Sequence, residues 1–314
     1  MPKIVALKIW DDIVDFSAIN PVVTIGSFDG VHLGHRQVID QLIRLSKQVK
    51  GESVIFTFSP HPAIVLNPGK EFVLLTTIDE KIELFRQAGI NHLVLYPFTE
   101  KIASLTYQEF VKQLLIDKLH INTLLVGYDH TIGKNREGNY EQLLQLSKNL
   151  DFKVVEQHEV TIEEGKLSST YIRKLLSQGL LTEASKLLGY PYLLSGTVVH
   201  GHRLGNKLGF PTANLLPPEN KFIPGYGVYA VLVQFEGITY QGMMNIGIRP
   251  TLKNTANTPL IEAHLFDFTG ILYDKFIKIS IIKKLRDEFQ FDSLESLKTQ
   301  LKKDKESALE ILNK

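Results

Sequence analysis

The sequence contains no cysteine, and this absence excludes several kinds of bond and site at once. Disulfides, thiolate metal sites and cysteine nucleophiles are all ruled out, and a reducing compartment fits better than an oxidising one. No apolar run approaches the roughly 20 residues that cross a bilayer. The apolar stretch at the start of the sequence is too short for a secretory signal and is soon followed by Asp11, Asp12 and Asp15. We therefore expect a cytoplasmic protein without a membrane partner.

A strong charge of one sign is also missing. The 35 basic and 34 acidic residues nearly cancel and leave a net charge of +1. No broad field would therefore steer the chain onto nucleic acid, and we expect no nucleic-acid partner. Any bound anion must be held by local groups. Nothing in the sequence specifies an oligomeric state.

The pattern of the 314 residues changes along the chain, which is longer than one core usually fills. The first part alternates β-rich and helical patterns, with strands expected at 22–28, 53–59, 92–98, 123–128 and 153–157, and helices at 35–49, 80–89, 107–119 and 140–150. Such alternation predicts an α/β, Rossmann-like domain whose parallel sheet is covered by helices on both faces. Ligands of such sheets gather at the carboxyl ends of the strands.

The second part has closely spaced strands, at 192–199, 227–235, 238–246, 261–268 and 276–282. These predict a small antiparallel β-barrel. A C-terminal helix is expected to begin near residue 291, with Asp292 as its cap and Glu295 three residues later, and to pack against the barrel. We therefore expect two domains, 1–185 and 186–314.

The turn after the first expected strand carries the clearest N-terminal motif, VVTIGSFDGVHLGHRQVI. His32 and His35 are three positions apart, which places both imidazoles on one face of a helix. A helix N-terminus offers free N–H groups and a positive dipole end, so the two histidines favour a polyphosphate site there. The alternative is that Gly26 and Gly30 form an ordinary turn beside surface histidines.

A second motif, LSSTYIRKLL, combines Ser168, Ser169 and Thr170 with Arg173. The hydroxyl residues would ordinarily cap a helix. A reciprocal capping box has Glu or Gln three residues after the cap, whereas Thr170 is followed at that offset by Arg173. A cation in that position favours a bound phosphate, and simple capping is the alternative.

Two further loops lie where strands should end. One, FSPHP, contains His61, and the other, GYDHTIGKNREGN, contains Asp129, Lys134 and Arg136. Both can be ordinary turn chemistry. A binding role and a structural role are equally open for His61 and Asp129, and a solvated loop is the favoured interpretation for Lys134 and Arg136.

A glycine-rich segment, GTVVHGHRLGNKLGFPTANL, opens the second domain. Glycines such as Gly201 and Gly205 permit close approach of the backbone to phosphate. Thr212 and Asn214, two apart on an extended segment, face the same way, so a hydroxyl and an amide oxygen could both reach a Mg²⁺ ion. A glycine-rich barrel turn followed by a polar strand is the alternative.

The expected strand IEAHLFDF supplies Glu262, on the face opposite Ala263 and Leu265. A carboxylate pointing into a barrel mouth either pairs with a cation or accepts a proton from an attacking hydroxyl during phosphoryl transfer. His264, on the same face, is expected to be structural. No P-loop is present, because every Gly-Lys pair is followed by something other than Ser or Thr. The residues alone therefore indicate two anion-binding sites and an ATP-dependent transfer.

The N-terminal motifs GSFDGVHLGH, FTFSPHP and SSTYIR resemble the FMN adenylyltransferase module of bacterial FAD synthetases, within the His-x-Gly-His nucleotidyltransferases. The resemblance implies that the FMN phosphate attacks the α-phosphorus of ATP directly, so that positioning and electrostatics supply the rate. It implies catalytic roles for His32, His35 and Arg173, a flavin contact for His61, and ATP binding by Gly26, Phe28, Asp29, His32, His35, Asp129, Ser169, Thr170 and Arg173. The chain departs from the family at His130 and Ile132, where aromatic residues are more frequent.

The C-terminal motifs PTAN, GVYAV, NIGIRPT, the Glu262 strand and LRDEFQFDSLESL resemble, in that order, the riboflavin kinase family. The resemblance implies riboflavin and MgATP as substrates, with Glu262 as the base toward the ribityl 5′-hydroxyl and Arg286 in a flavin-covering loop. It places Thr212 and Asn214 at the metal, and it implies contacts with ATP for Gly201, Gly205, Lys207, Thr212 and Asn214. Asp274 stands where the family usually has glycine.

Both resemblances join in one order across nearly the whole chain, which is the arrangement of the bacterial bifunctional riboflavin kinases and FMN adenylyltransferases. We therefore expect riboflavin, FMN and ATP as substrates, Mg²⁺ as cofactor, and FAD as the final product. A His-x-Gly-His ligase of the aminoacyl-tRNA synthetase kind is one rival, but it predicts a Lys-rich second motif and a basic RNA-binding face. A flavin carrier or sensor without turnover is another.

Overall fold

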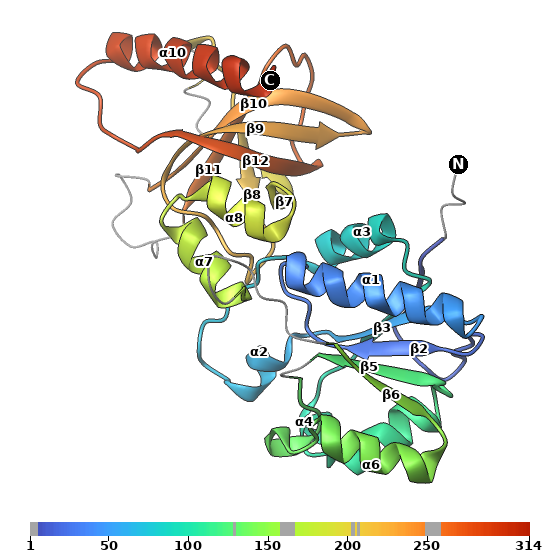
Figure 1. Ribbon diagram of the computed structural model, residues 1–314. Coiled ribbons are helices and arrows are strands. Elements are labelled where there is room, and N and C mark those ends of the chain that lie inside the picture. Colours follow the sequence, from blue (N-terminus) through green and yellow to red (C-terminus); the bar gives the residue numbers. More distant parts are fainter. Residues whose placement is uncertain (1–5, 128–129, 158–166, 202–204, 206–207, 249–258) are drawn as a thin grey trace. The chain divides into compact units, whose positions relative to one another are not determined.

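The computed structural model describes residues 6–127, 130–157, 167–201, 205, 208–248 and 259–314 (Figure 1). Asp129 and Lys207, both expected to bind ATP, lie outside these residues. The chain divides into two compact units: unit 1 is Met1–Phe72 with Ile78–Leu167, and unit 2 is Val73–Thr77 with Ser168–Lys314. This division assigns 168–185 to the second unit, whereas the sequence places the domain boundary after residue 185.

Unit 1 is built on a six-stranded sheet in which every pair of neighbours is parallel, which confirms the predicted α/β class. The strand order is β1-β4-β3-β2-β5-β6. The strands are β1 (Lys8–Trp10), β2 (Val22–Ile25), β3 (Ser53–Phe58), β4 (His92–Tyr96), β5 (Thr123–Gly127) and β6 (Lys153–Gln157). The order reverses between β2 and β5, and the carboxyl end of β2 is therefore the switch point at which open α/β sheets bind ligands.

Helices cover both faces of this sheet, with α1 and α3 on one face and α4 and α6 on the other (Figure 1). The helices of unit 1 are α1 (Leu33–Gln48), α2 (Pro62–Leu66), α3 (Ile78–Ala88), α4 (Glu100–Ala103), α5 (Tyr107–Phe110), the π-helix η1 (Val111–Ile116), the 3-10 helix η2 (Lys134–Arg136) and α6 (Tyr140–Leu150). The single helix expected at 107–119 is therefore α-helical only at its start. The wider turns of η1 bury Val111, Leu114 and Leu115.

Unit 2 contains a closed, wholly antiparallel barrel, as predicted, in the order β10-β11-β8-β7-β12-β9. Its strands are β7 (Tyr192–Val199), β8 (Ala213–Leu216), β9 (Gly227–Phe235), β10 (Ile238–Gly247), β11 (Leu260–Leu265) and β12 (Phe276–Arg286). Alternate residues of these strands are fully buried and fill the interior, among them Tyr192, Leu194, Tyr229, Met244, Ala263 and Ile279. Closure leaves no unpaired strand edge.

The helices that the structure describes in unit 2 are α7 (Ser169–Ser177), α8 (Leu181–Leu188) and α10 (Leu294–Leu312). Ala308 of α10 packs with Ala230 and Met243 of the barrel, so the predicted docking of the C-terminal helix is confirmed. Its cap, however, is Ser293, which has an extended backbone and a side chain that accepts from Ser296 N. The expected cap at Asp292 is therefore wrong by one residue.

A short segment from the N-terminal part of the sequence, Val73–Thr77, belongs to unit 2. Leu74 N donates to the Asn220 carbonyl at 2.6 Å, and Phe222 N donates to the Leu74 carbonyl at 2.8 Å. Between these bonds, Lys221 Nζ donates to the Leu75 carbonyl at 2.6 Å. The segment is thereby held as an extra strand-like bridge, and the Leu75 side chain is fully buried.

Candidate active sites

The turn from β2 into α1 brings the two predicted histidines together. His32 is the N-cap of α1, and its Nδ1 accepts from His35 N at 3.4 Å. The two imidazoles stack, with ring centroids 3.7 Å apart and an interplanar angle of 14°. The expectation that both rings share one face of the helix is confirmed.

Both imidazoles are neutral at pH 7. Burial lowers the pKa of His32 to about 4, against a smaller opposing effect of Asp29. Burial also holds the pKa of His35 well below its usual range, assisted by His32 and Lys81. Because His32 Nδ1 accepts a hydrogen bond, the proton of the neutral ring is on Nε2. These histidines can therefore offer N–H donors to an anion but no net charge.

A buried positive charge lies at this turn, on a residue that the sequence analysis did not single out. Lys81 of α3 is only 2% exposed, and its Nζ donates to the Ser27 carbonyl at 2.8 Å. Burial lowers the pKa of Lys81, and Asp29, an expected ATP-binding residue that is equally buried, opposes this shift. The signal was present in the spacing, because Lys81 lies on the apolar face of α3 that also carries Ile78 and Phe85.

A cavity of about 1040 Å³ opens in unit 1 next to this turn. It is lined by Gly26 from the turn, by His61, and by Lys134 and Arg136 from the loop after β5. His61 Nδ1 accepts from Ala63 N at 3.1 Å and so caps α2, while its ring stacks on Phe72 with centroids 4.7 Å apart. Lys134 and Arg136 are exposed and line the cavity at the same time, so the loop is solvated and could still contact a ligand.

The Ser/Thr-Arg motif lies at the start of α7 in unit 2. Ser168 is the N-cap and its Oγ accepts from Tyr171 N at 3.2 Å, which confirms the capping interpretation for this residue. Ser169 and Thr170 form the first turn of the helix. Arg173 Nε donates to the Val73 carbonyl at 3.0 Å. The expected contacts of Ser169, Thr170 and Arg173 with a triphosphate stay a prediction.

The barrel register gathers the C-terminal candidates. Glu262 on β11 pairs with Asn214 on β8 on one side and with Asn245 on β10 on the other. Directly opposed residues of antiparallel strands point to the same face, so the three polar side chains form a row across the sheet. The row continues through Val228 to Arg286, which ends β12.

This row lies on the outer wall of the barrel. Asn245 shares its face of β10 with Met243, which packs under α10, whereas the alternate residue Met244 is in the buried interior. Glu262 consequently faces outward, and the expectation that it points into the barrel mouth is wrong. The predicted alternation holds, because Ala263 and Leu265 are buried on the opposite face.

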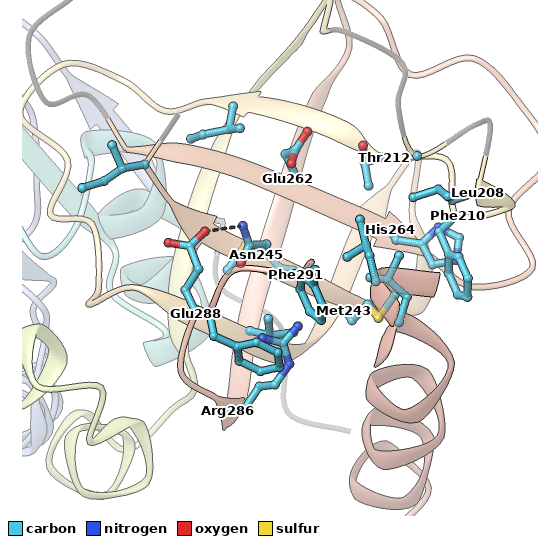
Figure 2. A pocket seen from close by; sticks show the side chains of 18 residues that line it. Leu208, Phe210, Thr212, Met243, Asn245, Glu262, His264, Arg286, Glu288 and Phe291 are labelled. Atoms are coloured by element: carbon cyan, nitrogen blue, oxygen red, sulfur yellow. Dashed lines mark hydrogen bonds between the residues drawn. The ribbon is translucent and has the colours of Figure 1, made fainter. Parts of the chain in front are cut away.

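A cavity of about 440 Å³ covers the row between the barrel wall, α10 and the segment after β12 (Figure 2). Its walls are largely apolar, with side chains such as Leu208, Phe210, Phe291 and Leu301. Glu262, Asn245 and Thr212 point into it from the barrel. A mostly apolar cavity with a few convergent polar groups is the usual form of a small-molecule site.

Two described glycines of the glycine-rich segment lie close to the residues expected at the metal. A Cβ on Gly201 would collide with the Asn214 side-chain amide, and one on Gly205 would collide with the Phe210 carbonyl. Among the described residues, Asn214 Oδ1 is buried and has no hydrogen-bond partner. His264 Nδ1 lies 2.7 Å from the Pro211 carbonyl, and burial lowers its pKa, so the neutral ring donates this bond and holds the chain next to Thr212.

Arg286 lines the cavity but is already engaged. Its guanidinium makes a forked contact with Asp304 of α10, with nitrogen–oxygen distances of 2.8 to 3.1 Å, and it lies 4.5 Å from the ring centre of Phe289. The same segment supplies Glu288, whose Oε1 accepts from Asn245 Nδ2 at 3.3 Å (Figure 2). Arg286 therefore anchors the covering segment to α10, and Glu288 and Asn245 are cavity residues that the sequence analysis missed.

Asp274 occupies the turn before β12 with a φ of +61°. Left-handed backbone is most easily adopted by glycine and is tolerated by aspartate. The departure from the family residue therefore leaves the turn in a conformation that glycine would also adopt. Tyr273, beside it, stacks on His200 with ring centroids 4.1 Å apart.

Two family profiles match the chain in the order of its two parts: FAD synthetase over residues 17–171 and riboflavin kinase over residues 188–312. Three similar proteins are described as bifunctional riboflavin kinase/FMN adenylyltransferase. The protein of Buchnera aphidicola subsp. Schizaphis graminum is 38% identical and the match covers 94% of this chain and 95% of the relative. The protein of Bacillus subtilis is 37% identical, with 92% and 91% covered, and that of Escherichia coli K12 is 36% identical, with 92% of each chain covered.

One solved structure is similar over almost the whole length. It is described as a macrolide-efflux protein from Streptococcus pneumoniae, with a TM-score of 0.85, 31% identity, and coverage of 96% of this chain and 98% of its own. Within the part of the chain that the structure describes, no helix combines the length and the apolar character needed to span a bilayer.

The neutral histidines predict a pH dependence of stability. A group whose pKa falls from 6.5 to about 4 on folding binds a proton more readily when unfolded, so unit 1 should lose stability as the pH falls from about 6.5 to about 4. His32→Asn, which keeps a capping side chain, should lower the steepness of this loss by up to about 1.4 kcal/mol per pH unit. Trp10 is the sole tryptophan and lies in unit 1, so its fluorescence during urea unfolding measures the effect. An unchanged steepness in the variant would contradict the neutral assignment.

Proposed function

The chain belongs to the family of bifunctional riboflavin kinases/FMN adenylyltransferases, and we propose from this premise how its residues divide the two reactions. The enzyme phosphorylates riboflavin to FMN and adenylylates FMN to FAD. We assign the first reaction to the cavity of unit 2 and the second to the β2–α1 turn and cavity of unit 1. The observation that carries the assignment is the polar row Asn214–Glu262–Asn245 at an apolar cavity. It supports phosphoryl transfer, and no described feature of the site favours the macrolide efflux named for the similar structure.

For the kinase reaction, the apolar cavity accommodates the flavin ring and its mouth accommodates the ribityl chain. The Glu262 carboxylate accepts the proton of the 5′-hydroxyl, whose oxygen then attacks the γ-phosphorus of ATP, and ADP leaves. Thr212 lines this cavity and also a smaller one of about 190 Å³ that includes Tyr273. We place the nucleotide in the smaller cavity, because Thr212 then lies between the two substrates.

The residues near Thr212 fit a Mg²⁺ ion. Hard oxygen donors suit this metal, and Asn214 Oδ1 is a buried oxygen whose hydrogen bond is not made by any described residue. Thr212 Oγ1 and Asn214 Oδ1 would hold the ion. When bound, the ion would neutralise charge on the phosphates. The contact between Gly201 and Asn214 leaves the amide little freedom to turn away.

For the adenylyl transfer, a phosphate oxygen of FMN attacks the α-phosphorus of ATP and pyrophosphate leaves. No protein nucleophile is required, so the enzyme has to position two substrates and stabilise charge. The N–H groups of His32, His35 and the N-terminus of α1 offer donors to the phosphates. The cavity lined by His61 is large enough for a flavin nucleotide, and Lys134 and Arg136 provide positive charge at its wall.

The assignment of one reaction to each unit predicts separable losses. Glu262→Gln should reduce FMN formation from riboflavin by at least about 100-fold, because the base is lost, and should leave FAD formation from supplied FMN unchanged. His32→Ala should do the reverse. Chromatographic separation of the flavins over time, with riboflavin or FMN as the starting substrate, measures both. Loss of both activities in either variant would contradict the two-site assignment.

The metal assignment predicts a selective change in Mg²⁺ dependence. Asn214→Ala should raise the Mg²⁺ concentration for half-maximal FMN formation at least about tenfold, equivalent to about 1.4 kcal/mol, because the ion loses one oxygen ligand. FAD formation by the same protein is the control and should keep its Mg²⁺ dependence. An unchanged requirement in the kinase reaction would remove Asn214 from the metal site.

A further inference from the structure

Unit 1 contains a buried positive charge that takes no part in the steps above. Lys81 is almost fully buried on α3, and its ammonium donates to the Ser27 carbonyl at 2.8 Å. Burying a lysine is costly unless the charge is compensated. Asp29 is buried close enough to act on the charge of Lys81 and so compensates part of this cost. Two opposite charges are therefore retained here, Asp29 in the turn that leads into α1 and Lys81 on α3.

The turn that Lys81 contacts has an unfavourable backbone. Phe28 has a φ of +48° and Val31 has a φ of +37°, both in the left-handed region, which a β-branched residue rarely adopts. Such conformations persist only where the surroundings hold them, and they concentrate at functional sites. Two side chains of α3, one helical turn apart, hold this one. Lys81 binds the Ser27 carbonyl, and Phe85 packs edge-on against Phe28 with ring centroids 5.8 Å apart.

The conformation of this turn determines where the phosphate-binding groups lie. The turn ends at His32, so it sets the position of the stacked imidazoles and of the first N–H groups of α1. Phe28 also packs against His35, with centroids 5.2 Å apart. The imidazoles carry no charge at pH 7, whereas the ammonium of Lys81 is near enough to disfavour protonation of His35.

We propose that Lys81 is a positioning residue for adenylyl transfer: it holds the strained 27–31 turn through the Ser27 carbonyl and supplies a buried positive charge toward the triphosphate without touching it. The proposal rests on the assignment of adenylyl transfer to unit 1. It explains why a charge lies on the apolar face of α3. It also makes α3, which contributes no residue to the cavity wall, part of the machinery that binds ATP.

The test compares Lys81→Met, Lys81→Gln and Lys81→Arg with the wild-type enzyme in FAD formation from supplied FMN, varying ATP and FMN separately. Lys81→Met should raise KM for ATP at least about tenfold, equivalent to about 1.4 kcal/mol, with KM for FMN unchanged. Lys81→Gln keeps an N–H donor but not the charge, so its KM for ATP should also be raised. Lys81→Arg keeps the charge, so its KM for ATP should be close to that of the wild type. Lys47→Met, at the exposed end of α1, is the matched control and should behave as wild type.

Two internal measurements keep the outcomes distinct. FMN formation from riboflavin in the same protein should be unchanged in all variants, and unfolding followed by Trp10 fluorescence reports whether unit 1 is folded. If the wild type makes no FAD, the proposed function of unit 1 fails. If the wild type is active and folded Lys81→Gln keeps the wild-type KM for ATP, or loses ATP and FMN affinity equally, the role given to Lys81 is overturned.

Discussion

The register of the closed barrel is the constraint on which the C-terminal site depends. Because a side chain changes face with every residue, only one alignment of β8, β11 and β10 brings Asn214, Glu262 and Asn245 into a single row on the outer wall. The apolar interior fixes that alignment, since a slip by one residue would turn buried side chains such as Ala263 outward. Core packing and site geometry are thus two results of the same pairing. The covering segment depends on it in turn, because Glu288 is bound to Asn245 and Arg286 to Asp304.

Both units use long polar side chains to hold backbone carbonyls outside their strands and helices. Lys81 binds the Ser27 carbonyl, Arg173 binds that of Val73, and Lys221 binds that of Leu75. His264 does the same at Pro211 with a neutral ring. Each bond satisfies a main-chain group outside regular secondary structure, where no ladder or helix can do so. At the two sites, the loops next to Phe28 and Thr212 are held in this way by Lys81 and His264.

The sequence predicted the classes of both units because their patterns are long and regular. It also predicted that His32 and His35 share one helix face and that Glu262 lies on a barrel strand, and both are observed. It failed where the outcome depends on tertiary contacts. The outward direction of Glu262 follows from α10 covering one wall, and the neutrality of the histidines follows from burial; neither is a property of a local pattern. The sequence places Lys81 on an apolar helix face, but its contact with the Ser27 carbonyl is seen only in the structure.

The bridge formed by Val73–Thr77 has a consequence for how the chain could be divided. The backbone passes from one unit to the other after Phe72, Thr77 and Leu167. No single cut in the chain can therefore separate the two units intact. A fragment that begins at residue 168 lacks the segment that pairs with 220–222, and it lacks the Leu75 carbonyl that accepts from Lys221 Nζ. A separately produced unit 2 that begins at residue 168 would therefore lack a contact that residues 73–77 make in this chain. The two units are thus interleaved in the sequence, although the two reactions are assigned to successive parts of the chain.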